Sequence, residues 1–230
     1  QREDVYSSSP FENLAVPVEA IDRIEVVRGP MSVIYGTGAF FGAINIITNQ
    51  VDEKTKRNTL AVSYGSDSTL RLVARSAGKE GDFKYAFTGY FYDTAGMNEP
   101  FSKMVSDSAI LPLLGVPENH TTEDRLEHSV KYFNFSGNFK GFHFDASYNE
   151  AYKEFSFLLP SPSVGTLKIR KSSRFGFGYE VDLSEKVKFD ARFRYLHFRY
   201  SDDFDWLAPG LYAYEDDGSQ SYKVELTMFY

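Results

Sequence analysis

Residues 21–48 have the sequence IDRIEVVRGPMSVIYGTGAFFGAINIIT. Two β-branched runs, Ile24–Val27 and Ala43–Thr48, enclose a segment rich in glycine. The first run ends at Gly29 and Pro30, and proline has no amide hydrogen with which to extend a ladder of hydrogen bonds. The corner contains three glycines, which allow positive φ or close backbone contact: Gly36, Gly38 and Gly42. The stretch therefore predicts two strands joined by a glycine-rich corner.

The glycine spacing in this corner also raises the alternative of a dinucleotide-binding loop. Such a loop leads into a helix, whose N-terminal amides hold the pyrophosphate. Here the last glycine leads directly into the β-branched residues Ile44–Ile47. The pattern therefore favours a structural turn over a nucleotide site.

The order of residues 17–48 is more specific than their types, and it resembles the end of the plug domain of TonB-dependent outer-membrane receptors. The match begins at Val16–Glu19 and departs from the family's pattern at Phe40 and Phe41, where smaller residues are common. The motif positions that carry the resemblance are Arg28, Gly29, Pro30, Tyr35, Gly36, Gly42 and Asn45. The resemblance implies an active transporter in which a small α+β plug lies inside a wide transmembrane β-barrel.

Composition limits the classes of function. The chain has 230 residues, with 32 acidic and 25 basic side chains and a net charge of −7, which argues against a nucleic-acid partner. It has no cysteine, so disulfides and thiolate metal sites are excluded. Aromatic residues make up 17% of the chain, but no run approaches the roughly 20 apolar residues of a membrane helix. Composition alone leaves both a soluble β protein and a transmembrane barrel open, because alternating strands escape hydropathy averages and aromatic girdles raise Phe and Tyr.

After residue 57 the chain becomes a series of runs in which apolar and polar residues alternate, as in a strand with two different faces. These runs lie around 60–64, 70–75, 83–91, 133–139, 142–149, 174–182, 187–195 and 222–228. We interpret them as the cores of strands of about 9–14 residues, a length that fits a tilted membrane strand better than the usual globular strand of about 5–6 residues. We predict an all-β membrane fold with about eight antiparallel strands.

The connections between these runs alternate in length. Tight turns are expected near 78–81, 140–141 and 183–186, and long connections over 93–127, 158–170 and 201–219. Outer-membrane barrels have this pattern, with short periplasmic turns and long extracellular loops. The segment 65–69 is then the first outer loop, and an unusually short one.

The resemblance also implies a division of the chain. We expect residues 1–50 to be the C-terminal part of a plug, 51–57 a hinge, and 58–230 the N-terminal strands of the barrel. An eight-stranded barrel has room inside only for side chains, so these strands are interpreted as the first eight of the family's 22. The signal peptide and the segment that TonB grips would lie upstream of residue 1.

Candidate ligand contacts follow from the resemblance, because ligands of this family bind at the plug apex and on the inner faces of barrel and loops. The apex corresponds to residues 6–13, where Tyr6, Phe11 and Asn13 offer aromatic faces and an amide. The segment 93–127 is too apolar for a simple solvated loop and is expected to cover the barrel mouth or a partner. Arg28 is expected to leave the plug and meet an acidic partner.

Metal and catalytic chemistry find little support. The four histidines, His120, His128, His143 and His197, lack a ligand spacing. Carboxylates in 202–205 and 215–217 flank one predicted loop and raise calcium as an alternative to plain solvated acidic residues. We expect no enzyme activity and no cofactor.

The favoured function is TonB-dependent import of a scarce nutrient across the bacterial outer membrane, with a ferric siderophore or another metal chelate as the substrate. Haem, cobalamin and glycans are alternative substrates. The expected partners are TonB, outer-membrane lipid and the small-molecule ligand. Two further alternatives stay open: a small eight-stranded outer-membrane barrel with a structural or adhesive role, and a soluble β-sandwich binding module.

Overall fold

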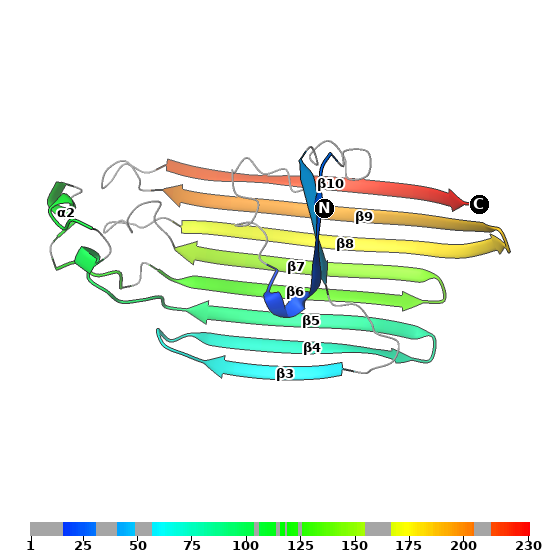
Figure 1. Cartoon of the computed structure of the whole chain (residues 1–230), viewed down its shortest axis with the longest axis horizontal. Helices are drawn as coiled ribbons and strands as arrows, with labels where there is room; N and C mark the ends of the chain where they lie inside the picture. The colour runs from blue at the N-terminus through cyan, green and yellow to red at the C-terminus, as the bar shows by residue number, and fades with distance from the viewer. Residues whose placement is uncertain are drawn as a thin grey trace.

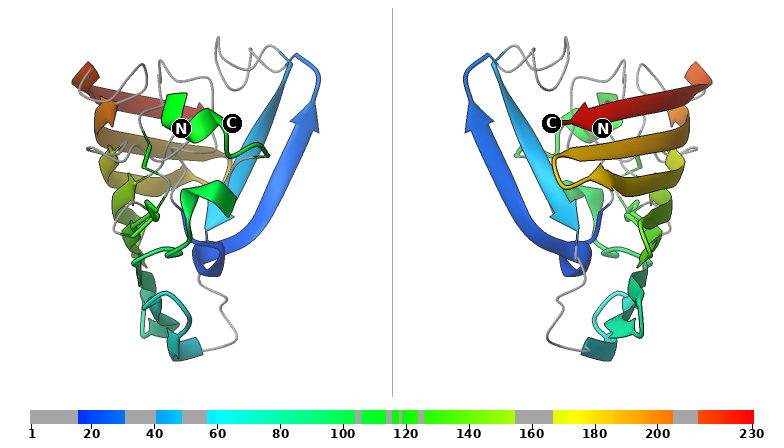
Figure 2. Two further views of the ribbon diagram at one scale, coloured as in Figure 1. Left: turned by 90° about the vertical axis from the view of Figure 1, so that its left-hand side faces the viewer. Right: turned by 90° about the vertical axis from the view of Figure 1, so that its right-hand side faces the viewer.

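The computed structural model describes residues 16–30, 41–48, 57–103, 106–113, 116–117, 119–123, 126–154, 167–204 and 213–230. These residues form a two-stranded sheet, β1–β2, and an eight-stranded sheet, β3–β10, which we call the wall sheet (Figure 1). The two are separate sheets, and the β1–β2 ribbon lies on one side of the wall sheet (Figure 2).

The β1–β2 ribbon is built from the two β-branched runs of the sequence. A short 3-10 helix, Val18–Ala20, leads into β1 (Ile21–Arg28), which pairs antiparallel with β2 (Gly42–Thr48). The pairing runs from Arg28 opposite Gly42 to Ile21 opposite Thr48. The two predicted strands are therefore confirmed.

The eight strands of the wall sheet lie side by side in sequence order, and every neighbouring pair is antiparallel. They are β3 (Arg57–Tyr64), β4 (Leu70–Glu80), β5 (Phe83–Thr94), β6 (His128–Phe139), β7 (Phe142–Glu154), β8 (Leu167–Ser184), β9 (Val187–Phe204) and β10 (Ala213–Phe229). β3 and β10 are the two edges of the sheet. The prediction of about eight long antiparallel strands is confirmed.

From β4 onward short and long connections alternate, and each kind gathers at one end of the sheet, while the short β3–β4 connection lies at the long-loop end (Figure 1). Two boundaries were predicted wrongly. β4 continues to Glu80, so the turn lies at 81–82 rather than at 78–81. Most of the predicted loop 201–219 is strand, because β9 continues to Phe204 and pairs there with Ala213 of β10. Backbone hydrogen bonds between strands form whether the side chains are polar or apolar. The polar ends of these strands therefore have the composition of a loop, although they are paired.

The two faces of the wall sheet differ in burial. The face with polar residues is buried and the apolar face is exposed, whereas a soluble protein buries its apolar face. The face that carries Arg71 is called the inner face, and it holds every buried wall residue other than glycine, eight of them polar or small. These residues are Val73, Ala86, Thr88, Tyr132, Asn134, Asn149, Ala151, Arg170, Asp190, Phe198 and Asp202. The outer face exposes Leu60, Val62, Tyr64, Leu72, Phe133, Phe139, Phe142, Phe175, Phe177, Phe193, Tyr222, Val224, Leu226 and Met228. A β-sandwich buries its apolar faces, so this arrangement contradicts that alternative and fits contact with lipid.

The apolar band on the outer face runs obliquely across the strands. The pairing register aligns Val62, the middle of the apolar run of β3, with Gly218 of β10. The apolar run of β10 is instead centred near Glu225, seven residues farther toward the short turns, and seven strand-to-strand steps separate β3 from β10. A shift of about one residue per strand, with a rise of about 3.4 Å and a spacing of about 4.8 Å, corresponds to a tilt of about 35°. Transmembrane barrel strands are tilted by about 35–45°.

The connection between β5 and β6 forms a small folded unit at the long-loop end of the sheet (Figure 1). It contains a 3-10 helix, Phe101–Lys103, and the single turn α2, Ile110–Leu113. Phe101, Leu111 and Val116 form its buried core. Across the described segments, no helix has the length and apolar character needed to cross a membrane.

Candidate functional site

The β1–β2 ribbon contacts the wall sheet through an ion pair. Arg71 of β4 points from the inner face and its guanidinium pairs with the carboxylate of Glu19, in the 3-10 helix before β1. Both side chains are partly buried. Since Glu19 directly precedes β1 and Arg71 belongs to the wall sheet, this pair holds the start of the ribbon against the wall, beside which the ribbon lies in Figure 2.

Within the ribbon, Glu25 of β1 is held by two donors. Arg23 donates from Nε to Glu25 Oε1 at 2.8 Å, and the Asn45 amide of β2 donates to Glu25 Oε2 at 3.2 Å. The hydrogen bond from Arg23 and then that from Asn45 lower the pKa of the Glu25 carboxyl below its ordinary value of 4.5. Asn45, one of the predicted motif positions, therefore ties β2 to β1 through a side chain as well as through the ladder.

The corner after β1 requires glycine at two positions. Gly29 has φ of 104°, a conformation that side chains rarely adopt, and its amide donates to the Phe41 carbonyl at 3.1 Å. A Cβ atom on Gly42 would lie 2.6 Å from the carbonyl oxygen of Val27. Gly42 is thus the residue that lets the two strands approach at the corner.

The inner face of the wall sheet carries paired charges. Arg170 of β8 forms a two-pronged ion pair with Asp202 of β9, and both side chains are at least nine-tenths buried. The Tyr200 ring lies 5.2 Å from the Arg170 guanidinium. Nearer the short turns, Arg192 donates to Asp190 at 2.9 and 2.6 Å. Such a wall suits a polar, plug-filled interior, since a buried charge needs a partner.

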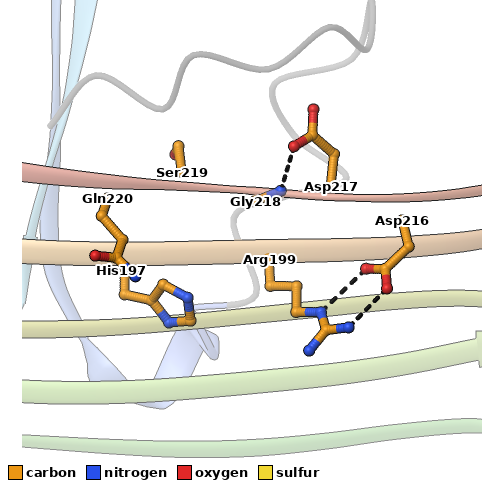
Figure 3. Close-up of a pocket in the computed structure, with 7 residues that line it drawn as sticks. All are labelled: His197, Arg199, Asp216, Asp217, Gly218, Ser219 and Gln220. Atoms are coloured by element: carbon orange, nitrogen blue, oxygen red, sulfur yellow. Dashed lines mark hydrogen bonds and ion pairs between the residues drawn. The ribbon is translucent and has the colours of Figure 1, made fainter.

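An open depression of about 350 Å³ lies over β9 and β10. Figure 3 shows its lining residues: His197, Arg199, Asp216, Asp217, Gly218, Ser219 and Gln220. Arg199 is fixed by Asp216, to which its Nε and Nη2 donate at 3.0 and 2.6 Å. Most of these side chains belong to the outer face of the sheet, so the depression faces away from the β1–β2 ribbon.

The structure places some predicted site residues and does not describe others. Gly29, Gly42 and Asn45 meet at the β1–β2 ribbon, and Arg28 and Pro30 are exposed at its end. The acidic partner expected for Arg28 stays a prediction. Tyr6, Phe11, Asn13, Tyr35 and Gly36 lie outside the described residues.

The acidic segment considered for calcium was placed wrongly in a loop. Asp202 and Asp216 lie within strands, where each carboxylate is held by an arginine. Within the ranges that the structure describes, no group of three or more His, Asp or Glu side chains could hold a metal ion. The calcium alternative therefore has no support in these ranges.

Two pairs on the inner face were missed by sequence reasoning. Glu19 and Arg71 are 52 positions apart, and Arg170 and Asp202 are 32 apart. Polar residues at every second position of a strand indicate which face is the inner one. Which side chains pair across neighbouring strands depends on the register, which the sequence does not show. The charges themselves were therefore the only signal in the sequence.

The β1–β2 ribbon lies on the polar side of an antiparallel wall of long strands, and comparison with known proteins shows what this arrangement resembles. Residues 3–43 match the model of the TonB-dependent receptor plug domain. An iron-regulated outer membrane virulence protein of Vibrio cholerae is 37% identical over 81 residues, 35% of this chain and 12% of that protein. The vitamin B12 transporter of Vibrio vulnificus is 42% identical over 67 residues, 29% of this chain and 11% of that protein.

Solved structures agree in fold. The crystal structure of the siderophore receptor PiuA from Acinetobacter baumannii matches with a TM-score of 0.58 and 13% identity, over 91% of this chain and 32% of that one. At this identity the likeness is one of fold. Taken with the plug match and the named outer-membrane relatives, it shows that the chain is similar to TonB-dependent outer-membrane receptors, of whose length it spans a third or less.

Proposed function

We propose that the protein imports a scarce nutrient across the bacterial outer membrane with energy delivered through TonB. The ligand binds from outside, and a rearrangement of the plug then opens a path along the inner face of the wall. The observation that carries the proposal is a plug-family segment joined to the polar inner face through the ion pair of Glu19 and Arg71. Its partners would be TonB, outer-membrane lipid and a small-molecule ligand.

The proposed substrate is a ferric siderophore or a similar metal chelate. The names of several relatives support it, among them a ferric enterobactin receptor of Pseudomonas aeruginosa that is 49% identical over 43 residues, 19% of this chain and 6% of that protein. Cobalamin is the second candidate, because vitamin B12 transporters of Vibrio vulnificus are also among the relatives. Haem and glycans stay alternative substrates.

The proposal also assigns a role to each segment of the chain. Residues 1–50 act as the end of the plug, 51–57 as a hinge, and 58–230 as wall strands with the long connections extracellular. Tyr6, Phe11 and Asn13 are proposed to contact the ligand at the plug apex. Arg28, Gly29, Pro30, Tyr35, Gly36, Gly42 and Asn45 are proposed to maintain the plug corner.

Uptake by cells tests this function. A strain lacking the gene and the same strain complemented with the gene are given radiolabelled ferric siderophores. Labelled cobalamin is tested in parallel. We expect saturable uptake of one chelate that is lost in the deletion strain and equally lost when TonB is absent. Uptake that persists without TonB would contradict the proposal, and a structural role would follow if every ligand entered both strains equally.

A further inference from the structure

The folded unit between β5 and β6, the described part of residues 95–126, is called the cap unit. Backbone hydrogen bonds join its two ends to each other. The Phe101 amide donates to the His120 carbonyl at 3.1 Å, and the Thr122 amide donates to the Glu99 carbonyl at 2.9 Å. The two ends therefore run side by side as a short antiparallel pair, and the connection has a structure of its own, which is typical of long connections with a function.

Buried side chains hold the cap unit together. Thr122 is fully buried, and its hydroxyl donates to the Met97 carbonyl and accepts from the Glu99 amide at 3.0 Å. The apolar core of the unit has three members: Phe101, Leu111 and Val116. A buried hydroxyl whose hydrogen bonds are satisfied, next to an apolar core, favours one packing over others. We therefore expect the cap unit to behave as one rigid body.

Thr94, at the end of β5, ties the cap unit to the turn between β3 and β4. Its hydroxyl donates to the Asp67 carbonyl at 3.2 Å and lies 2.8 Å from the Thr69 hydroxyl. The same hydroxyl accepts from the Gly96 amide at 3.2 Å. The Ala95 amide donates to the Asp67 carbonyl at 3.0 Å. These contacts, which we call the clamp, join the start of the cap unit to the neighbouring hairpin.

The backbone on both sides of the clamp has conformations that are unfavourable for most residues. Asp67 and Ser68 have φ of 55° and 54°, although neither is glycine. Such left-handed residues persist where the surrounding contacts hold them, and they are common at functional sites. On the other side, Gly96 has φ of 74°, and a Cβ atom there would overlap the Leu126 carbonyl oxygen at the far end of the cap unit. The turn and the cap unit thus fix each other's geometry.

The cap unit overhangs the inner face of the wall sheet. Its 3-10 helix and α2 lie beyond the long-loop end of the sheet (Figure 1). They also lie on the side of the sheet where the β1–β2 ribbon lies (Figure 2). Molecules that approach the inner face from this end therefore meet the cap unit first.

We propose that the cap unit is a fixed cover over the entrance to the inner face, and that Thr94 holds it at its angle through the clamp. Thr94 is then a positioning residue, because it acts through the cap unit and not on a ligand. A fixed cover does not close on a ligand; it limits the size of the molecules that reach the wall beneath it. The direction of entry rests on the proposed function, which makes the long connections extracellular.

Distances between spin labels test the clamp in the full receptor, from which any cysteine outside this chain is removed. One pair of labels joins the cap unit to the wall, at Leu113→Cys and Leu60→Cys, and a second pair lies within the cap unit, at Leu113→Cys and Glu123→Cys. Dipolar spin-resonance measurements should give one narrow distance distribution for each pair. Thr94→Val keeps the branched shape and removes the hydroxyl. We expect it to broaden the first distribution and to leave the second narrow.

The matched control is Thr121→Val, the same substitution within the cap unit. The Thr121 hydroxyl accepts a long hydrogen bond of 3.4 Å from the Glu123 amide, and its loss should leave both distributions narrow. A broad cap-to-wall distribution without Thr94→Val, or an unchanged one with it, would overturn the proposal. Broadening of both pairs by Thr94→Val would also overturn it, because Thr94 would then fold the cap unit and not hold its angle.

Labelling of an inner-face cysteine in intact cells tests the cover. Lys153 of β7 pairs with His128, the residue at which the chain returns from the cap unit to the wall. Lys153→Cys is treated with a small maleimide and with a maleimide attached to a long polyethylene glycol chain. We expect the large reagent to be excluded, and this exclusion to be lost in Thr94→Val but kept in Thr121→Val. Equal exclusion in the two variants would contradict a cover held by the clamp.

A cysteine at the tip of the cap unit separates this result from a failure of the proposed function. Leu113 is 85% exposed, so Leu113→Cys should react with the large reagent in intact cells whenever the long connections are extracellular. If it does not react, the proposed orientation is wrong and the cover with it. The distance measurements still decide whether Thr94 holds the cap unit.

Discussion

At the level of single residues, the β1–β2 corner depends on the absence of a side chain at Gly42. The backbone of β1 passes so close that a Cβ atom would lie 2.6 Å from the Val27 carbonyl oxygen. The contact would be between a Cβ atom and a backbone oxygen. Neither atom moves when a side chain changes its rotamer, so such a change cannot relieve the clash. Gly42 therefore determines whether the plug corner can form.

The substitution Gly42→Ala tests this contact. We expect it to destabilise the corner by about 1–3 kcal/mol, the usual cost of forcing an extra methyl group into packed structure. Faster proteolysis of the plug segment in the full receptor would be the readout. Gly65→Ala is the matched control, because its new methyl group would meet Thr69 Cβ at an ordinary 3.6 Å and should change little. Equal sensitivity of the two variants would refute the close approach.

Glu25 predicts a pH dependence in the same ribbon. Its pKa is lowered in the folded state, so the stabilisation is present above the unfolded pKa of about 4.3 and is lost as pH falls through the folded value. Amides of β1 and β2 should exchange hydrogen more slowly in the wild-type protein than in Glu25→Gln at neutral pH. The difference should shrink as the pH falls below the ordinary carboxyl pKa and close once it is below the lowered pKa of folded Glu25. A difference that persisted in acid would show that the Glu25 charge is not its source.

At the level of strands, the buried pair of Arg170 and Asp202 joins β8 to β9 near the long loops. We expect Asp202→Ala to destabilise the wall by about 3–5 kcal/mol, because it leaves a buried guanidinium without its main partner. Asp82→Ala is the control, since Asp82 and Lys140 are exposed at a turn and an exposed pair contributes about 1 kcal/mol or less. The midpoint of heat-shifted gel mobility compares the two, and similar midpoints would argue that the Arg170 charge is solvated.

The strands were predictable from sequence, whereas their ends and cross-strand partners were only partly so. Alternation of Phe133, Phe135 and Phe139 with polar neighbours identified β6 and its outer face, because period two is imposed by the pleat. The ends of β9 and β10 were missed, because Asp202 and Asp216 have the composition of a loop and are stabilised by arginines on other strands. Such pairs become visible only once the register is known.

For the whole molecule, the main support for a membrane wall is which of its two faces is buried. The polar Asn134 is 6% exposed on the inner face, while its neighbour Phe133 is 42% exposed on the outer face. The sequence pattern predicted two unlike faces, but it did not tell which one is buried, since a soluble sheet has the same alternation. The resemblance of residues 17–48 to a plug selected the membrane interpretation, and the burial pattern agrees with it.

Site-directed spin labelling along β6 tests this central claim most directly, because the chain has no cysteine of its own. Single cysteines at Phe133, Asn134, Phe135 and Ser136 are labelled in the full receptor in lipid, and collision rates with oxygen and with a water-soluble nickel chelate are measured. We expect period two: labels at Phe133 and Phe135 meet oxygen, as they would in lipid, and those at Asn134 and Ser136 are shielded from it. Equal oxygen exposure at all four positions, or the opposite phase, would contradict an outer-membrane wall with a plug on its polar face.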